Sequence, residues 1–305
     1  VWSQIATHHV YGGVVPELAS RKHIEKIVPV VQEALTEADI KTTDLDGVAV
    51  TCGPGLVGAL LVGLSFAKAF AYALGLPLAG VDHLQGHLIS VYLEPNPPPY
   101  PFVALLASGG HTNVEYVRGP TESERMGQTR DDAAGEAFDK VSKLMGLGYP
   151  GGRVIEALAR EGDPQRVKFP RALMNNGDFD FSFSGLKTAV ARYQKGRTAD
   201  VSAGHGDVAA GFQEAVVDVL VCKAIRAARE KRCRHLAVVG GVASNSRLRE
   251  RIYEEARRKE IQVYIPGLAL CSDNAAMIAA VGHHKLLERD NAGLDLDAYS
   301  KSPRK

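Results

Sequence analysis

The chain has 305 residues, of which 45% are hydrophobic and 23% charged, and its formal net charge is +1 at pH 7. This composition is typical of a soluble globular protein, and the length allows one large α/β domain or two of ordinary size. The small net charge excludes a strong overall basic field for nucleic acids, although the 36 lysines and arginines can still cluster locally.

The cysteines contain no C-x-x-C pair, which argues against a zinc ribbon or a disulfide framework and fits a reducing cytosol. We expect all four to be buried small hydrophobes, namely Cys52, Cys222, Cys233 and Cys271.

The first part of the chain alternates helical and strand patterns. Val1–Ile5 is strand-like, and because the chain begins with Val1 we expect the true N-terminus to be missing. Apolar residues at helical spacing predict an amphipathic helix over Glu17–Ala38. Asp46–Thr51 is predicted as a short buried strand. The apolar segment Leu56–Leu74 is interrupted by a lysine and by glycines, so it predicts a buried helix and no membrane span.

Two histidines follow the next predicted strand, Leu78–Val81. His83 and His87 are four residues apart, so on a helix they share one face, at the spacing that a divalent metal needs from a pair of helical ligands. The end of a strand is also the usual place for a ligand site in an open α/β sheet. Two surface histidines would show the same spacing, and a third ligand is needed to decide.

A proline-rich stretch, Glu94–Pro101, has five prolines in eight residues and predicts a domain boundary. A predicted strand over Phe102–Ala107 then leads through Ser108-Gly109-Gly110 into a return strand over Asn113–Arg118. Small residues, hydroxyls and N–H groups in such a hairpin can bind a phosphate. A plain hairpin turn is the alternative.

An acidic helix is predicted over Asp131–Met145. Carboxylates at a helix start are usually partners of the helix dipole. Asp139 lies two turns inside the helix and escapes that explanation, so it could bind a substrate hydroxyl. Aromatic and polar residues alternate in Asn175–Ser184, which suits packed core more often than contacts with RNA bases. A helix is predicted over Gly185–Tyr193.

The last third repeats the strand–glycine turn–helix pattern. A long helix over Asp207–Lys231 and a strand over His235–Val239 precede the turn Gly240–Asn245, in which Ser244 and Asn245 are placed as helix caps. A nucleotide base or ribose could rest against its glycines. Ile261–Ile265 is predicted as the last strand.

Asp273 precedes a final predicted helix, Ala275–Leu287. It is either the N-cap of that helix or an oxygen ligand that completes a His, His, Asp metal site with open positions. The tail after Asp290 is expected to fray.

Taken in order over nearly the whole chain, these motifs resemble the TsaD family of tRNA adenosine threonylcarbamoyltransferases, once labelled glycoproteases. The motifs that carry the resemblance are Gly12–Arg21, Gly53-Pro54-Gly55-Leu56, His83-x-x-Gly86-His87-Leu88, Ser108–Thr112, Asp131–Lys140, Tyr149–Gly152, Phe181–Lys187, Gly240–Asn245 and Asp273–Met277.

The resemblance implies an α/β, actin/hexokinase-like (ASKHA) fold with two lobes. We expect duplicated βββαβα halves with a helical insertion at about 130–205, and with the first strands of lobe one missing. Lobe one comprises residues 1–94, with the final segment 274–305 packing back on it, and lobe two comprises residues 95–273.

The resemblance also implies transfer of threonylcarbamoyl from threonylcarbamoyl-AMP to N6 of adenosine 37 in tRNAs reading ANN codons. His83, His87 and Asp273 match the ligands of one Fe²⁺ or Zn²⁺ ion. TsaB-like and TsaE-like proteins are the implied partners, in the cytoplasm or alternatively the mitochondrial matrix, with no membrane. The positions that match substrate contacts are Leu106, Ala107, Ser108, Gly109, Gly110, Asp139, Gly152 and Asn245.

No side chain is a convincing nucleophile, so we expect direct transfer, with His111 as a candidate proton relay or phosphate donor. A zinc protease would need glutamate after the first histidine, where this chain has Leu84. The alternatives that stay open are an actin-like ATPase or kinase and a non-catalytic partner subunit.

Overall fold

The computed structural model describes residues 2–9, 11, 13–196 and 204–302. The chain forms a mixed α/β fold of two compact units, one made of Val1–Leu93 and Asn274–Lys305, the other of Glu94–Asp273.

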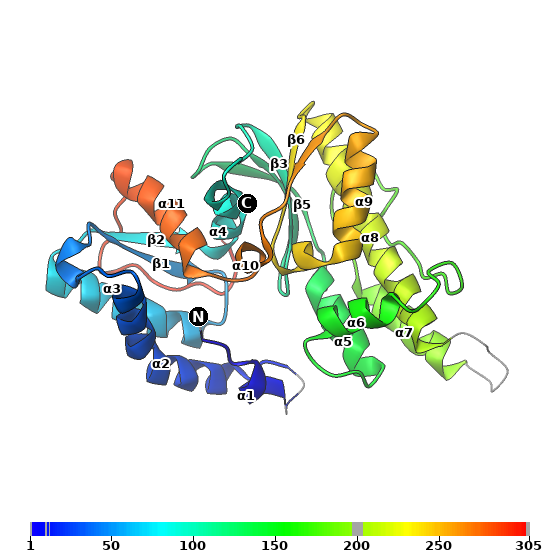
Figure 1. Ribbon diagram of the computed structural model, residues 1–305, viewed down its shortest axis with the longest axis horizontal. Helices are drawn as coiled ribbons and strands as arrows, with labels where there is room; N and C mark the ends of the chain where they lie inside the picture. The colour runs from blue at the N-terminus through cyan, green and yellow to red at the C-terminus, as the bar shows by residue number, and fades with distance from the viewer. Residues whose placement is uncertain (1, 10, 12, 197–203, 303–305) are drawn as a thin grey trace. The chain divides into compact units, whose positions relative to one another are not determined.

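The first unit is built on two parallel strands, β1 (Val48–Gly53) and β2 (Leu78–Asp82), joined by the crossover helix α3 (Val57–Leu74). Helix α2 (Pro16–Glu37) packs against α3, and α11 (Ala275–Leu287) packs against both strands. Figure 1 shows α3 and α11 on opposite faces of the strand pair. The short helices α4 (His83–Ile89) and η2 (Ser90–Leu93) follow β2, and η1 (Thr42–Asp44) precedes β1.

The prediction that α3 is a buried helix is wrong. Its buried residues are Leu64, Ala67 and Ala71, whereas Leu61 is 41% and Tyr72 is 77% exposed. In the part of the chain that the structure describes, the sheet beneath α3 is two strands wide, so it covers only one stripe of the helix. By length and composition alone, α3 could also cross a membrane. Core helices of water-soluble proteins meet the same two criteria.

Both ends of the first unit differ from expectation. Residues 2–5 form no strand, and helix α1 (Ile5–His9) begins at Ile5, while Val1 lies outside the described residues. The expectation that the tail frays after Asp290 is wrong for its described part, residues 291–302. The tail bonds to β2 through Ala292, whose N–H donates to the carbonyl of Leu78 at 2.7 Å, because its apolar residues find a place beside the strand pair.

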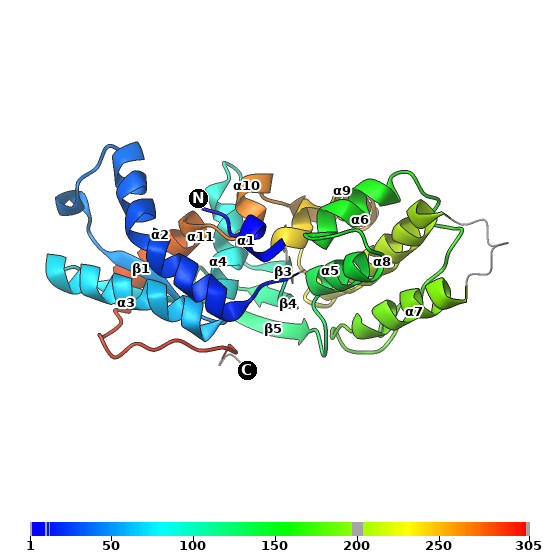
Figure 2. The ribbon, with the colours of Figure 1, turned by 90° about the horizontal axis from the view of Figure 1, so that it is seen from below.

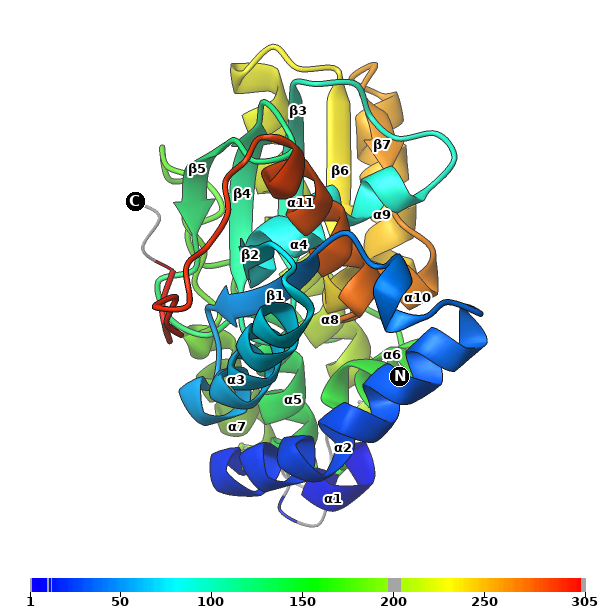
Figure 3. The same ribbon diagram turned by 90° about the vertical axis from the view of Figure 1, so that its left-hand side faces the viewer.

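The second unit is built on a five-stranded sheet in the order β5-β4-β3-β6-β7, visible from left to right in Figure 3. Strands β3 (Phe102–Ala107), β4 (Thr112–Val117) and β5 (Ser123–Gln128) are an antiparallel meander, and sequence analysis missed β5. Strands β6 (His235–Val239) and β7 (Gln262–Tyr264) continue the sheet parallel to β3. The long helix α8 (His205–Glu230) packs against β3, β4 and β6.

The remaining helices of this unit lie at the carboxyl ends of β3 and β6 or beside α8, as Figure 2 shows for α5, α6 and α7. Their bounds are α5 (Ala134–Leu144), α6 (Gly151–Ala159), α7 (Ser184–Lys195), η3 (Gly241–Ser244), α9 (Ser246–Arg257) and α10 (Leu268–Cys271). The alternating aromatics Phe179, Phe181 and Phe183 are buried, which confirms the core interpretation of that segment.

Asp131 is not part of the helix that it was expected to start. One of its carboxylate oxygens accepts the backbone N–H groups of Phe183 and Ser184, and the other accepts the Ser184 hydroxyl at 2.9 Å. Asp131 therefore ties the start of α7 to the segment before α5, a pairing across about fifty residues that local sequence does not show.

Candidate functional site

The first candidate site is the histidine pair on α4. Asp82 is the N-cap of this helix, and its Oδ1 accepts the N–H groups of Leu84 at 2.9 Å and Gln85 at 3.3 Å. The helix carries His83 and His87 on one face, with ring centroids 4.7 Å apart. His87 is fully buried and His83 half-buried. The predicted i, i+4 geometry is thus present.

Asp273 supplies the third ligand-type atom. One atom from each of His83, His87 and Asp273 lies within 4.8 Å of the others. Asp273 is bonded directly to Asn274, where the first unit resumes, and Asn274 is the true N-cap of α11, since its Oδ1 accepts the N–H of Met277 at 2.9 Å. The alternative of Asp273 as the N-cap is therefore wrong. Two imidazoles and a carboxylate suit Fe²⁺ or Zn²⁺.

The second candidate site lies where β3 and β6 end. These strands are parallel neighbours, so the turn Ser108–Gly110 after β3 and the turn Gly240–Asn245 after β6 meet at one edge of the sheet. Gly240 adopts φ +89°, and a Cβ there would lie 2.5 Å from the carbonyl oxygen of Ala107. Only glycine allows this approach.

Side-chain and backbone hydrogen bonds link these turns to two helix starts. The N–H of Gly135, in the first turn of α5, donates to the carbonyl of Ser108 at 3.1 Å. Asp139, further along α5, accepts the N–H of Gly151 at 2.7 Å and so holds the start of α6. Next to Gly151, Gly152 faces open space at that helix start. These contacts place the Ser108 turn beside the start of α5, and Asp139 beside the start of α6.

Burial raises the pKa of Asp139 above its ordinary value, which the bond from Gly151 partly offsets and the nearby charge of Glu136 reinforces. A partly buried carboxyl with a raised pKa beside a helix start is a candidate for binding a substrate hydroxyl.

Asn245 ends the second turn and caps α9. Its Oδ1 accepts the N–H of Leu248 at 3.0 Å, which confirms the predicted cap, and its Nδ2 donates to Gln213 Oε1 at 2.8 Å. Ser244 is not a cap, because its hydroxyl donates to the carbonyl of Gly241. Gln213, on α8, was not predicted as a site residue, because no local sequence pattern around it indicates this contact.

Glu156 is a second site residue that was not predicted from the sequence. Its Oε1 accepts the N–H of Ser246 at 3.0 Å and so joins α6 to the start of α9. A glutamate in a helix gives no local signal for such a contact.

The remaining predicted positions offer backbone or half-exposed groups. Leu106 and Ala107 are completely buried, so only their backbone atoms are available to a ligand. His111 closes the Ser108 turn, since its N–H donates to Ser108 Oγ at 3.1 Å and its carbonyl accepts the N–H of Ser108 at 2.8 Å. Its imidazole is half-buried beside Gly109 and Gly110, which are exposed.

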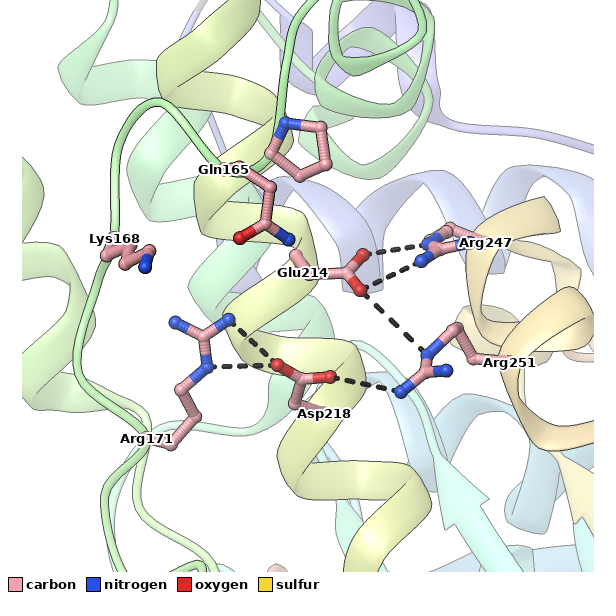
Figure 4. A pocket seen from close by; sticks show the side chains of 8 residues that line it. Gln165, Lys168, Arg171, Glu214, Asp218, Arg247 and Arg251 are labelled. Atoms are coloured by element: carbon pink, nitrogen blue, oxygen red, sulfur yellow. Dashed lines mark hydrogen bonds and ion pairs between the residues drawn. The ribbon is translucent and has the colours of Figure 1, made fainter. Parts of the chain in front are cut away.

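A charged cavity of about 460 Å³ lies beside this site in the second unit. Figure 4 shows Arg171, Arg247 and Arg251 converging on Glu214 and Asp218, both on α8. Both oxygens of Glu214 accept from Arg247, at 2.7 and 2.9 Å, and Asp218 accepts two bonds from Arg171. The hydrogen bonds from Arg247 hold the pKa of Glu214 below its usual range. Each of the three arginines is ion-paired, and the pairs of Arg247 and Arg251 with the two carboxylates join α9 to α8.

Comparison with known proteins places the chain among relatives of one kind. A family model described as "TsaD: tRNA N6-adenosine threonylcarbamoyltransferase" matches residues 1–280. A protein of that name from Desulforapulum autotrophicum is 55% identical over 99% of this chain and 91% of its own length. A protein of the same name from Syntrophus aciditrophicus is 51% identical over 99% of this chain and 89% of its own length. Another from Geotalea uraniireducens is 53% identical over 99% of this chain and 88% of its own length.

Among solved structures, nucleotide- and phosphate-bound HypF is similar with a TM-score of 0.64 and 16% identity, over 86% of this chain and 41% of HypF. Component A of Acidaminococcus fermentans (R)-2-hydroxyglutaryl-CoA dehydratase has a TM-score of 0.51 and 14% identity, over 83% of this chain and 81% of its own. At such low identity the likeness shows the fold alone.

Proposed function

The chain belongs to the family of tRNA N6-adenosine threonylcarbamoyltransferases, enzymes that place a threonylcarbamoyl group on N6 of an adenosine in tRNA, and from this premise we propose how its residues divide the work. The single observation that carries the proposal is the group His83, His87 and Asp273, whose ligand-type atoms lie within 4.8 Å of one another. The donor is threonylcarbamoyl-AMP and the acceptor is adenosine 37 of tRNAs reading ANN codons.

The second unit binds the adenylate part of the donor. The N–H groups of Gly109 and Gly110 receive the phosphate, because both glycines are exposed and an added Cβ at either would meet nothing within 4 Å. The N–H of Ser108 is bonded to the His111 carbonyl, so Ser108 contributes its hydroxyl instead. Asp139 and Gly152 contact the ribose, and Asn245 the nucleoside. Leu106 and Ala107 contribute backbone atoms only.

His83, His87 and Asp273 hold one Fe²⁺ or Zn²⁺ ion. When bound, the ion supplies Lewis acidity and a template for the threonyl or carbonyl oxygens. Asp82 caps the start of α4, and the four-residue spacing places both imidazoles on one face of this helix.

Transfer is direct. The adenosine N6 attacks the carbamoyl carbon, a C–N bond forms, the bond from that carbon to the phosphate oxygen breaks, and AMP leaves with the electron pair. His111, beside the phosphate turn, accepts the proton that N6 loses or donates to the phosphate. Because AMP is a good leaving group, no covalent enzyme intermediate is needed, and trapping one would contradict this mechanism.

The finer architecture is also part of the proposal. The two units are the lobes of a duplicated actin/hexokinase-like fold, lobe one being 1–94 with 274–305 and lobe two 95–273, with an insertion at about 130–205 of which 197–203 lie outside the described residues. TsaB-like and TsaE-like proteins assist the reaction, which takes place in the cytoplasm.

The test is transfer of labelled threonylcarbamoyl from its adenylate to a tRNA with adenosine 37, with TsaB-like and TsaE-like partners present. We expect transfer by the chain, its loss in His83→Ala, and wild-type transfer by His283→Ala, which changes a histidine of α11 outside the proposed sites. ATP hydrolysis without transfer would favour an actin-like ATPase or kinase, and partner binding without transfer a non-catalytic subunit. Equal transfer by His83→Ala and wild type would contradict the metal assignment.

A further inference from the structure

The C-terminal segment of the chain, red in Figure 2, leaves α11 as an extended strap of residues 291–302. The strap contacts the beginning, the middle and the end of β2. Ala292 bonds to Leu78, Leu296 packs against Gly80, where an added Cβ would lie 2.8 Å from the leucine Cδ2, and Tyr299 reaches Asp82. The strap therefore ends at the residue that caps the helix of the histidine pair.

The two carboxylate oxygens of Asp82 have different partners. Oδ1 accepts the N–H groups of Leu84 and Gln85 and so starts α4. Oδ2 accepts the hydroxyl of Tyr299 at 2.9 Å and that of Ser302 at 3.1 Å. The strap thus orients the carboxylate, and the carboxylate orients the first turn of α4, on which His83 is the first residue.

Tyr299 is itself held in place. Its N–H donates to the carbonyl of Cys52 at 2.9 Å, and its ring lies where a side chain on Gly53 would be, 2.4 Å from an added Cβ. Burial raises the pKa of its hydroxyl, so at neutral pH it remains a donor. The strap therefore has a defined position at the end of β1 as well as at the end of β2.

We propose that Tyr299 and Ser302 are positioning residues for the metal site, acting through Asp82 on the helix of His83 and His87. This rests on the proposed metal function of that pair. The physical reason is preorganisation, because ligands already held in their bound orientation lose less conformational freedom when the ion binds.

The experiment measures Zn²⁺ affinity of the purified, metal-free full chain by chelator competition. We expect Tyr299→Phe to weaken binding about threefold and the double variant Tyr299→Phe, Ser302→Ala about tenfold, at the low end of what outer contacts of metal ligands contribute. The matched controls Tyr253→Phe, on the exposed face of α9, and Ser300→Ala, exposed on the strap, should bind as wild type does.

A double-mutant cycle separates positioning from general packing. Asp82→Ser keeps an oxygen that can cap α4 but removes the acceptor for the strap. In the Asp82→Ser background, Tyr299→Phe should have no further effect on Zn²⁺ affinity. An equal loss in both backgrounds, or wild-type affinity of Tyr299→Phe, would overturn the proposal.

Hydrogen exchange gives a readout that needs no metal. Tyr299→Phe should speed exchange of the Leu84 and Gln85 amides in the metal-free chain. Unchanged exchange would contradict the proposal that the strap orients the first turn of α4. If the wild type bound Zn²⁺ no better than His87→Ala, the metal function itself would fail, while the amide exchange would still decide whether the strap orients α4.

Discussion

At the scale of single residues, Gly240 decides whether the two turns of the second unit can meet. Its φ of +89° and the 2.5 Å approach to the Ala107 carbonyl leave no room for a side chain. Gly241, next to it, faces open space and has no positive φ. The two neighbouring glycines therefore differ in what they contribute to the structure.

We expect Gly240→Ala to lower the free energy of unfolding by about 3 kcal/mol, because strain and a backbone clash add. Gly241→Ala should cost under about 1 kcal/mol. Urea denaturation of both variants measures the difference, and equal losses would show that the close approach is unimportant.

Asn245 combines a cap and a contact to Gln213 in one side chain. Asn245→Ala should lower the free energy of unfolding by about 2 kcal/mol, roughly half from the lost cap and half from the partner left unsatisfied. Ser244→Ala, at the exposed neighbour, should change it by under about 0.5 kcal/mol. Denaturation curves test both, and a loss in Ser244→Ala as large as in Asn245→Ala would point to the turn as a whole.

At the scale of elements, α8 and α9 are joined by two kinds of contact at successive residues of α8. Gln213 binds Asn245 at the proposed nucleotide turn, and Glu214 binds Arg247 in the charged cavity of Figure 4. The ion pair thus supports the helix whose start carries Asn245. Its strength depends on the charge of Glu214.

The stabilisation from the Glu214–Arg247 ion pair therefore depends on pH in a defined direction. Since the pKa of Glu214 is lowered in the folded state, its stabilisation is present above the unfolded value of about 4.3 and is lost as the pH falls through the lower folded value. Glu214→Gln should therefore reduce stability at pH 7, by about 2 kcal/mol, with the difference from wild type shrinking below about pH 4. Thermal unfolding between pH 3 and 7 measures it.

The matched control is Glu250→Gln, which removes the exposed second partner of Arg247. Exposed pairs contribute little, so this change should cost under about 0.5 kcal/mol at any of these pH values. A pH-independent loss in Glu214→Gln would mean that shape, not charge, is what Glu214 supplies.

At the scale of the whole molecule, the two units carry different chemistry. The first holds the histidine helix on a sheet that is two strands wide in the described residues, and the second gathers glycine turns and helix starts at the edge of a five-stranded sheet. A narrow sheet buries little, so a bound ligand should contribute visibly to the stability of the first unit.

Zn²⁺ at a hundredfold excess over its dissociation constant should stabilise the wild type by about 2.7 kcal/mol. His83→Gln should show no Zn²⁺-dependent shift in unfolding temperature, and chelation should return the wild type to its metal-free value. A shift in His83→Gln as large as in the wild type would place the ion elsewhere.

Local sequence pattern was enough to predict many of the helices and strands and the spacing of the two histidines, although it missed β5. Periodicity predicted α11 and β6 with the bounds that the structure has, four-residue spacing placed His83 and His87 on one helix face, and residue type identified Asn245 as a cap. These features depend on backbone hydrogen bonds and side chains a few residues apart. Motif order also identified the family.

Contacts between residues far apart in the chain became visible only in the tertiary structure. This structure placed Gln213 on Asn245, Glu156 on Ser246 and Tyr299 on Asp82, and it left α3 exposed where an apolar run predicted burial. The physical reason is that burial and long-range hydrogen bonds depend on which surfaces the fold brings together. The local sequence pattern does not indicate which surfaces these are.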